Sequence, residues 1–184
     1  MKLLLPFLLC ACSPTVRPAA VPTLTLEASD GATRDLRAEF AGAPATVLVF
    51  FDPHCPCMSA HEARLQALRD ELGPRGVRWF LIDSEVGASV ARDQGWVKER
   101  SLPFPMLVDA GGKLAKATGA QYASYTVVVD GTGRVLYAGG IDDEKSHLTD
   151  QATPYLREAL TDILEGKPPR RAEGKVLGCA LELY

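Results

Sequence analysis

The sequence predicts one α/β domain with a central mixed sheet flanked by helices, and three patterns support this fold class. Residues 45–51 form a continuous apolar, β-branched and aromatic run, which is typical of a strand buried on both faces of a sheet. Residues 58–72 carry apolar side chains at helical spacing, and residues 77–82 form a second buried strand. Residues 126–138 predict a hairpin around an Asp-Gly-Thr-Gly turn. A strand–helix–strand unit followed by a hairpin predicts parallel strands joined to antiparallel ones.

Shorter elements fill the intervals between these patterns. An alternating segment at 24–26 precedes a turn signal at 29–31, which predicts a strand at the start of the domain. Residues 86–100 predict a weak helix. Residues 103–109 predict an extended segment, which leads through a glycine turn into a short helix ending at Ala117.

The last predicted helix carries its apolar residues on one face and ends at the Lys-Pro-Pro sequence of residues 167–169. Thr149 or Asp150 is the expected N-cap, because side-chain oxygens of these residue types accept hydrogen bonds from first-turn N–H groups. The length of 184 residues and the 47% apolar content suit one compact domain with a proper core.

The charge balance argues against one class of partner. Twenty Lys and Arg residues against 23 Asp and Glu residues give a net charge of -3. This balance offers no electrostatic reason to bind a polyanion. We therefore expect no nucleic acid partner.

The first residues predict export and a lipid anchor. Residues 3–9 form an apolar run that is too short to cross a bilayer as a helix. The run leads into Leu-Cys-Ala-Cys at residues 9–12, which resembles a bacterial lipobox. In such a sequence a small residue precedes the cysteine that receives the lipid. Cys12 is the expected attachment site, because Ala11 precedes it.

This assignment divides the chain into a signal peptide over residues 1–11, a Pro- and Ala-rich tether over 12–22 and a folded domain over 23–184. The mature protein is then lipid-anchored in the bacterial cell envelope and faces the periplasm, where disulfides persist. Ser13 stands where an Asp would signal inner-membrane retention, which favours the outer membrane. The alternative is a soluble secreted protein cleaved near Ala19 or Ala20.

Cys55 and Cys57 are the candidate catalytic residues, because Cys55-Pro56-Cys57 stands between a predicted strand and a predicted helix. Cys55 occupies the expected N-cap, and Pro56 suits the first helical position. The N–H groups and positive dipole end of a helix N-terminus favour the reactive thiolate. The alternative is that both cysteines are buried and serve as small apolar residues.

Cys179 is a third thiol of the domain, and its role stays open at the level of sequence. With Cys12 lipidated, an odd number of thiols remains in the domain, so one is left unpaired or pairs with another chain. Cys179 either locks the C-terminal tail against the domain, resolves a disulfide from Cys55, or is a free thiol.

Several sequence segments share their order and spacing with a known family. They are the Asp-Gly turn at 30–31, the strand at 46–51 leading into Cys55-Pro56-Cys57, the segments at 104–109 and 127–131, the Ile-Asp-Asp sequence at 141–143 and the Gly-Cys pair at 178–179. Together they make the chain resemble the redoxin group of the thioredoxin superfamily. That group includes periplasmic thiol–disulfide proteins and peroxiredoxins.

The resemblance implies a thioredoxin-like fold and a thiol–disulfide oxidoreductase that acts on protein or small-molecule thiols and disulfides without a cofactor. Cys55 is then the attacking thiol and Cys57 its resolving partner. Two differences from the relatives bear on this role. One residue separates the cysteines where thioredoxins usually have two, and Ala123-Ser124-Tyr125 stands where the family has a proline.

Two alternative functions remain at this stage. A thiol peroxidase would oxidise Cys55 to a sulfenic acid, although Asp52 stands where peroxiredoxins have Thr or Ser. A copper-binding protein would use the soft ligands near the motif, which are His54, Cys55, Cys57, Met58 and His61. For His61, which lies on the apolar stripe of the predicted helix, a hydrogen-bonded core position is favoured over metal ligation.

Overall fold

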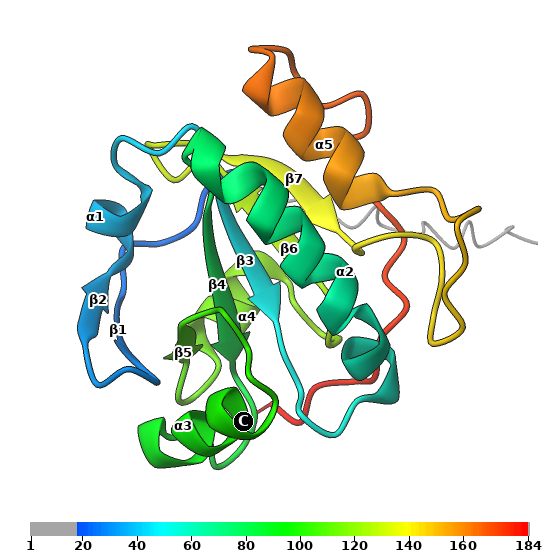
Figure 1. The fold of residues 1–184 in the computed structure, drawn as a ribbon. Helices are drawn as coiled ribbons and strands as arrows, with labels where there is room; N and C mark the ends of the chain where they lie inside the picture. Colours follow the sequence, from blue (N-terminus) through cyan, green and yellow to red (C-terminus); the bar gives the residue numbers. More distant parts are fainter. Residues whose placement is uncertain (1–17, 184) are drawn as a thin grey trace, which may run out of the picture.

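The computed structural model describes residues 18–183, and within them a seven-stranded mixed sheet forms the centre of the fold (Figure 1). The strands are β1 (Thr25–Ala28), β2 (Thr33–Asp35), β3 (Thr46–Phe50), β4 (Arg78–Asp83), β5 (Met106–Val108), β6 (Thr126–Val129) and β7 (Val135–Gly139). Their spatial order is β2-β1-β5-β4-β3-β6-β7. The β3–β4 and β4–β5 pairs are parallel, and the other pairs are antiparallel.

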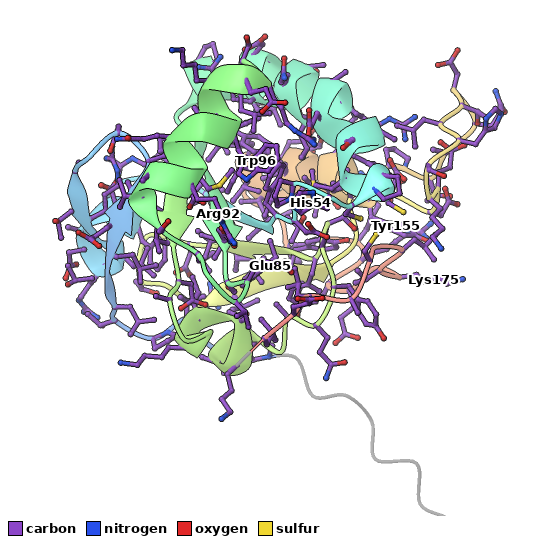
Figure 2. The ribbon with its side chains drawn as sticks, turned by 90° about the horizontal axis from the view of Figure 1, so that it is seen from below. His54, Glu85, Arg92, Trp96, Tyr155 and Lys175 are labelled. Carbon is purple, nitrogen blue, oxygen red and sulfur yellow. The ribbon has the colours of Figure 1, made fainter. Side chains whose placement is uncertain are left out.

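The helices cover both faces of this sheet. They are α1 (Leu36–Phe40), α2 (Pro56–Leu72), the 3-10 turn η1 (Gly73–Arg75), α3 (Val90–Glu99), α4 (Lys113–Thr118) and α5 (Tyr155–Leu164). Helices α2 and α5 lie on one face, and α4 lies on the opposite face (Figures 1 and 2). The predicted α/β class and its mixed sheet flanked by helices are confirmed.

Strand β3 occupies the centre of the sheet and leads directly into the cysteine motif. All five of its residues are buried, because strands pair with it on both sides and helices cover both faces. The prediction of a doubly buried strand at 45–51 is confirmed. The chain leaves β3 at Phe50 and enters α2 at Pro56, so the start of α2 lies at the carboxyl edge of the parallel strands.

The last helix begins later than the sequence predicts. Its N-cap is Pro154, and neither Thr149 nor Asp150 caps it. Thr149 is engaged elsewhere, because its N–H donates to the carboxylate of Glu144 at 2.7 Å. Proline before the first helical turn costs no hydrogen bond, since the N–H groups there have no partner within the helix. The cap prediction was therefore wrong.

Residues 19–21 and 172–174 run along the outer edge of β7. On one side the N–H of Val21 donates to Gly133 (2.9 Å) and the N–H of Val135 donates to Ala19 (3.0 Å). Further along, the N–H of Ala138 donates to Ala172 (3.0 Å). The predicted tether over residues 12–22 therefore overlaps the folded domain at its C-terminal end.

The predicted signal peptide and Cys12 lie outside the described residues. Within residues 18–183, no helix has the length and apolar character needed to cross a membrane.

Candidate active site

The N-terminus of α2 places Cys55 and Cys57 as the sequence predicts. Cys55 is the N-cap in an extended conformation (φ −77°, ψ 113°), Pro56 is the first helical residue and Cys57 follows in the first turn. The Cys55 side chain makes no capping hydrogen bond to the helix. Its sulfur is therefore free to make contacts outside α2 while it remains beside the positive end of the helix dipole.

Three thiols meet at this point. The Sγ atoms of Cys55, Cys57 and Cys179 all lie within 4.8 Å of one another, and all three cysteines are free. The backbone N–H of Cys179 donates to the sulfur of Cys55 at 3.3 Å. Cys55 is 0% exposed and Cys57 2% exposed, whereas Cys179 is half-buried. We call these residues the thiol cluster.

Residues 178–183, which we call the C-terminal segment, cover the thiol cluster. Backbone hydrogen bonds hold the segment, from the N–H of Ala123 to Cys179 (2.9 Å), from Leu181 to Gln121 (2.9 Å) and from Val86 to Glu182 (2.8 Å). The loop at 123–124 that pairs with it is the one where the family has a proline. Here Ser124 adopts a left-handed conformation (φ 69°), and the described residues contain no cis peptide bond.

Burial and mutual repulsion disfavour ionisation of two of the three thiols. Burial raises the pKa of Cys57, and the neighbouring Cys55 raises it further. The same two causes, with burial again the larger, raise the pKa of Cys179 to about 12. Like groups in one low-dielectric site cannot all carry a charge. Cys57 and Cys179 are consequently protonated at neutral pH.

A second polar cluster lies on α2, one turn further from the site. The Nδ1 of His61 lies 2.7 Å from the Cys57 carbonyl, and its Nε2 lies 3.0 Å from a carboxylate oxygen of Asp142. Arg64 donates to the other oxygen of Asp142 and also reaches Glu144 at 3.3 Å. We call these four side chains (His61, Arg64, Asp142 and Glu144) the His61 network.

The partners of His61 fix its charge. A backbone carbonyl and a carboxylate are both acceptors, so both ring nitrogens must donate and the ring is an imidazolium. Burial opposes this charge, but the hydrogen bonds to Asp142 and to the Cys57 carbonyl outweigh burial and raise the pKa of His61. In the same way His61 and Arg64, with the backbone N–H of Glu144, outweigh burial and lower the pKa of Asp142.

Of the five soft ligands proposed for copper from the sequence, Cys55 and Cys57 lie together, whereas His54, Met58 and His61 are engaged elsewhere. His61 has both nitrogens engaged within its network, and Met58 is fully buried in the core. The ring of His54 packs edge-on against Trp96, with centroids 5.3 Å apart, and the two residues are neighbours in Figure 2. The residue that does join Cys55 and Cys57 is Cys179, although it lies 124 residues from Cys55 along the chain.

The loop before Cys55 is fastened to α2 by Arg100. Its guanidinium donates to the carbonyl of Pro53, to the Ser59 hydroxyl (2.8 Å) and to Glu62 (2.5 Å). The same group lies over the ring of Trp96, 5.5 Å from its centroid. These contacts fix the approach of the chain to Cys55, and no sequence pattern indicated them.

Acidic residues gather at the carboxyl ends of β3 and β4, on the side of Glu85 and Arg92 in Figure 2. Asp93 in α3 is fully buried, and burial together with Asp83 raises its pKa to about 8. Burial, with Asp52 and Asp83 nearby, also raises the pKa of Glu85. Arg92 offsets part of this charge by donating to Asp83.

The fold and the site define a class of protein. A mixed sheet of this order, with a cysteine motif at the N-terminus of the helix that follows its central strand, is a thioredoxin-like domain. A family model described as Redoxin matches residues 15–153, so the chain belongs to the redoxin family.

Solved structures share the fold of this chain. A hypothetical protein from Sinorhizobium meliloti 1021 is 24% identical with a TM-score of 0.82, and the match covers 94% of this chain and 97% of that one. An uncharacterized conserved protein from Geobacillus kaustophilus is 26% identical with a TM-score of 0.81, covering 92% and 94%. A secreted disulfide oxidoreductase of Mycobacterium tuberculosis is 25% identical with a TM-score of 0.51, covering 61% and 80%. The comparison with curated proteins gave no match.

Proposed function

We propose that this protein is a thiol–disulfide oxidoreductase of the cell envelope in which Cys55 attacks and Cys57 resolves. One observation carries the proposal. The sulfur of Cys55 lies at the N-cap of α2 and accepts the Cys179 N–H at 3.3 Å, while the other two thiols lie within 4.8 Å. An N–H donor and a helix N-terminus both stabilise negative charge on sulfur, which is the form that attacks a disulfide.

The exchange proceeds in two displacements. The Cys55 thiolate attacks one sulfur of the substrate disulfide, which forms a mixed disulfide and releases the other substrate sulfur as a thiolate. The Cys57 thiol then loses its proton and attacks the Cys55 sulfur, which releases the second substrate thiolate. Two electrons pass from the protein to the substrate, and a Cys55–Cys57 disulfide remains. The reverse sequence oxidises a substrate dithiol.

The cover over the site favours Cys57 over Cys179 as the resolving thiol. Cys55 is 0% exposed, so a protein substrate reaches it only after the C-terminal segment moves aside. Cys179 moves with that segment, whereas Cys57 stays on the first turn of α2. In the mixed disulfide, Cys57 is therefore the thiol that remains close to the Cys55 sulfur.

Three serine variants test the proposal with a model disulfide whose reduction is followed by absorbance. Cys55→Ser should abolish the reaction. Cys57→Ser should make one attack and then stop as a mixed disulfide on Cys55, visible by mass spectrometry of the intact protein. Cys179→Ser is the matched control for loss of one buried-site thiol, and it should still complete both steps.

Two results would overturn this assignment. Equal rates for the parent protein and Cys55→Ser would remove Cys55 from the attacking role. Rapid consumption of peroxide, with a sulfenic acid on Cys55, would replace the exchange reaction with a thiol peroxidase cycle.

The proposed location is tested separately. We propose that Cys12 carries the lipid and that the domain faces the periplasm, on the basis of the Leu-Cys-Ala-Cys sequence at residues 9–12. Mass spectrometry of the mature N-terminus should find an acylated Cys12, and fractionation should find the protein in the outer membrane. An unmodified N-terminus beyond Cys12 would refute the anchor and leave the exchange proposal standing.

A further inference from the structure

The thiol cluster has a geometry that disulfide exchange does not require. Exchange needs two thiols at a time, whereas three sulfurs from two separate parts of the chain converge here. We propose that Cys55, Cys57 and Cys179 together bind one Cu(I) ion through their three sulfur atoms. This proposal does not rest on the exchange reaction, because it concerns the same sulfurs in their reduced state.

The spacing of the sulfurs fits a three-coordinate ion. Metal–thiolate bonds of about 2.3 Å place three sulfurs about 4 Å apart around a central ion. The three Sγ atoms already lie within 4.8 Å of one another, so small side-chain rotations close the site. The ligands also come from two segments that are already in contact, since the Cys179 N–H is bonded to the Cys55 sulfur.

The donor set selects the metal. Soft thiolate ligands favour Cu(I), zinc and iron–sulfur clusters. Structural zinc and iron–sulfur sites usually use four protein ligands. Among the described residues no histidine nitrogen or carboxylate oxygen joins the three sulfurs as a fourth ligand. Of the three kinds of centre, Cu(I) is the one for which three sulfur ligands complete the coordination.

The surroundings suit the charge of the complex. Cu(I) and three thiolates carry a net charge of −2, after three protons leave the thiols. The N-terminus of α2 directs its positive dipole end at this charge, and Lys145 also interacts favourably with Cys57. The buried position of Cys55 and Cys57 keeps water from the ion and slows oxidation of its ligands.

The test uses the full chain with Cys10 and Cys12 replaced by serine, so that the thiol cluster supplies every remaining thiol. The reduced protein is titrated anaerobically with Cu(I) against a chromophoric chelator. We expect one ion per chain, with X-ray absorption showing three Cu–S bonds of about 2.3 Å. Cys55→Ser, Cys57→Ser and Cys179→Ser should each weaken binding at least about 100-fold, because even outer-shell changes cost 10- to 100-fold.

His54→Ala is the matched control, since it removes a soft ligand next to Cys55 and should leave the affinity unchanged. A Cys179→Ser variant that binds as tightly as its parent would overturn the proposal, and so would two-sulfur coordination or a preference for Zn²⁺. The number of Cu–S bonds is measured by X-ray absorption on the protein with all three cluster cysteines intact, so this part of the test does not depend on whether the serine variants fold. The same preparation is also assayed for reduction of the model disulfide. If it reduces the disulfide but binds no copper, only the copper site is refuted and the exchange proposal stands.

Discussion

Two clusters of ionisable side chains lie one helical turn apart on α2, and their compositions are opposite. The thiol cluster brings together three identical groups, in which Cys55 raises the pKa of Cys57, and Cys55 and Cys57 both raise the pKa of Cys179. The His61 network brings together complementary groups, so that an imidazolium and a guanidinium face carboxylates. The thiols of the first cluster are free to react, whereas the charged groups of the His61 network are paired with one another.

On the same helix, the His61 network therefore has a structural role and the thiol cluster a reactive one. The His61 network links α2 to the segment after β7 through the His61–Asp142 hydrogen bond, and the other ring nitrogen of His61 binds the Cys57 carbonyl. The thiol cluster is held in place by that framework, yet none of its sulfurs has a fixed covalent partner. Changes in the network should therefore affect stability most, and changes near the thiols should affect accessibility.

The largest effect is expected from Asp142→Ala. This change leaves the buried His61 without its carboxylate, while Arg64 keeps Glu144 as an acidic partner, and removing one partner of a buried ion pair typically costs about 3–5 kcal/mol. Urea denaturation should show a loss of this size. Asp143→Ala is the control, because that neighbouring carboxylate is exposed and its removal should cost clearly less. Equal losses for the two variants would contradict the structural role of the network.

An intermediate effect is expected from Gly178→Ala, which acts on the cover of the thiol cluster. A Cβ at this position would lie 1.7 Å from the Ala123 carbonyl oxygen, so the C-terminal segment must shift, at a cost of about 1–3 kcal/mol. Alkylation of Cys55 by iodoacetamide should then accelerate about tenfold or more. Gly95→Ala, where a Cβ meets open space, should leave the rate unchanged. An unaltered rate in Gly178→Ala would show that the segment does not control access.

The smallest effect is expected in the pH dependence of stability. Because the pKa of His61 is raised in the folded state, its contribution is complete below about pH 6.5 and is lost as the pH rises through the folded value. Asp93 also makes the protein less stable as the pH rises, from about pH 4 up to its folded pKa of about 8. The difference between the parent and His61→Gln isolates the His61 part, and it should shrink from pH 6 to pH 9. A constant difference would mean that His61 is neutral.

The fold was largely predictable because its signals are local. The buried run that became β3 and the helical spacing that became α2 each depend on a dozen or so neighbouring residues. The exception is the start of α5, where Thr149 matched the residue type of an N-cap but had been recruited by Glu144. Residue type predicts what a side chain can do, and tertiary partners decide what it does.

The site was only half predictable, for the same reason. The placement of Cys55 and Cys57 at a helix N-terminus follows from adjacent residues. The approach of Cys179 depends on a segment 124 residues away, so its role stayed open. The Ile-Asp-Asp sequence at 141–143 is one of the segments that resemble the family, but the pairing of Asp142 with His61 exists only in the folded chain.

Residues 19–21 and 172–174 cover an edge of the sheet that would otherwise be open to another strand. Strand β7 is an outer strand, and an unpaired outer strand offers a row of N–H and C=O groups on which another molecule can add its own strand. Here residues 19–21 and 172–174 occupy that row, and the opposite edge is only the three-residue, charged β2. Both borders of the sheet are thus closed to edge-to-edge aggregation.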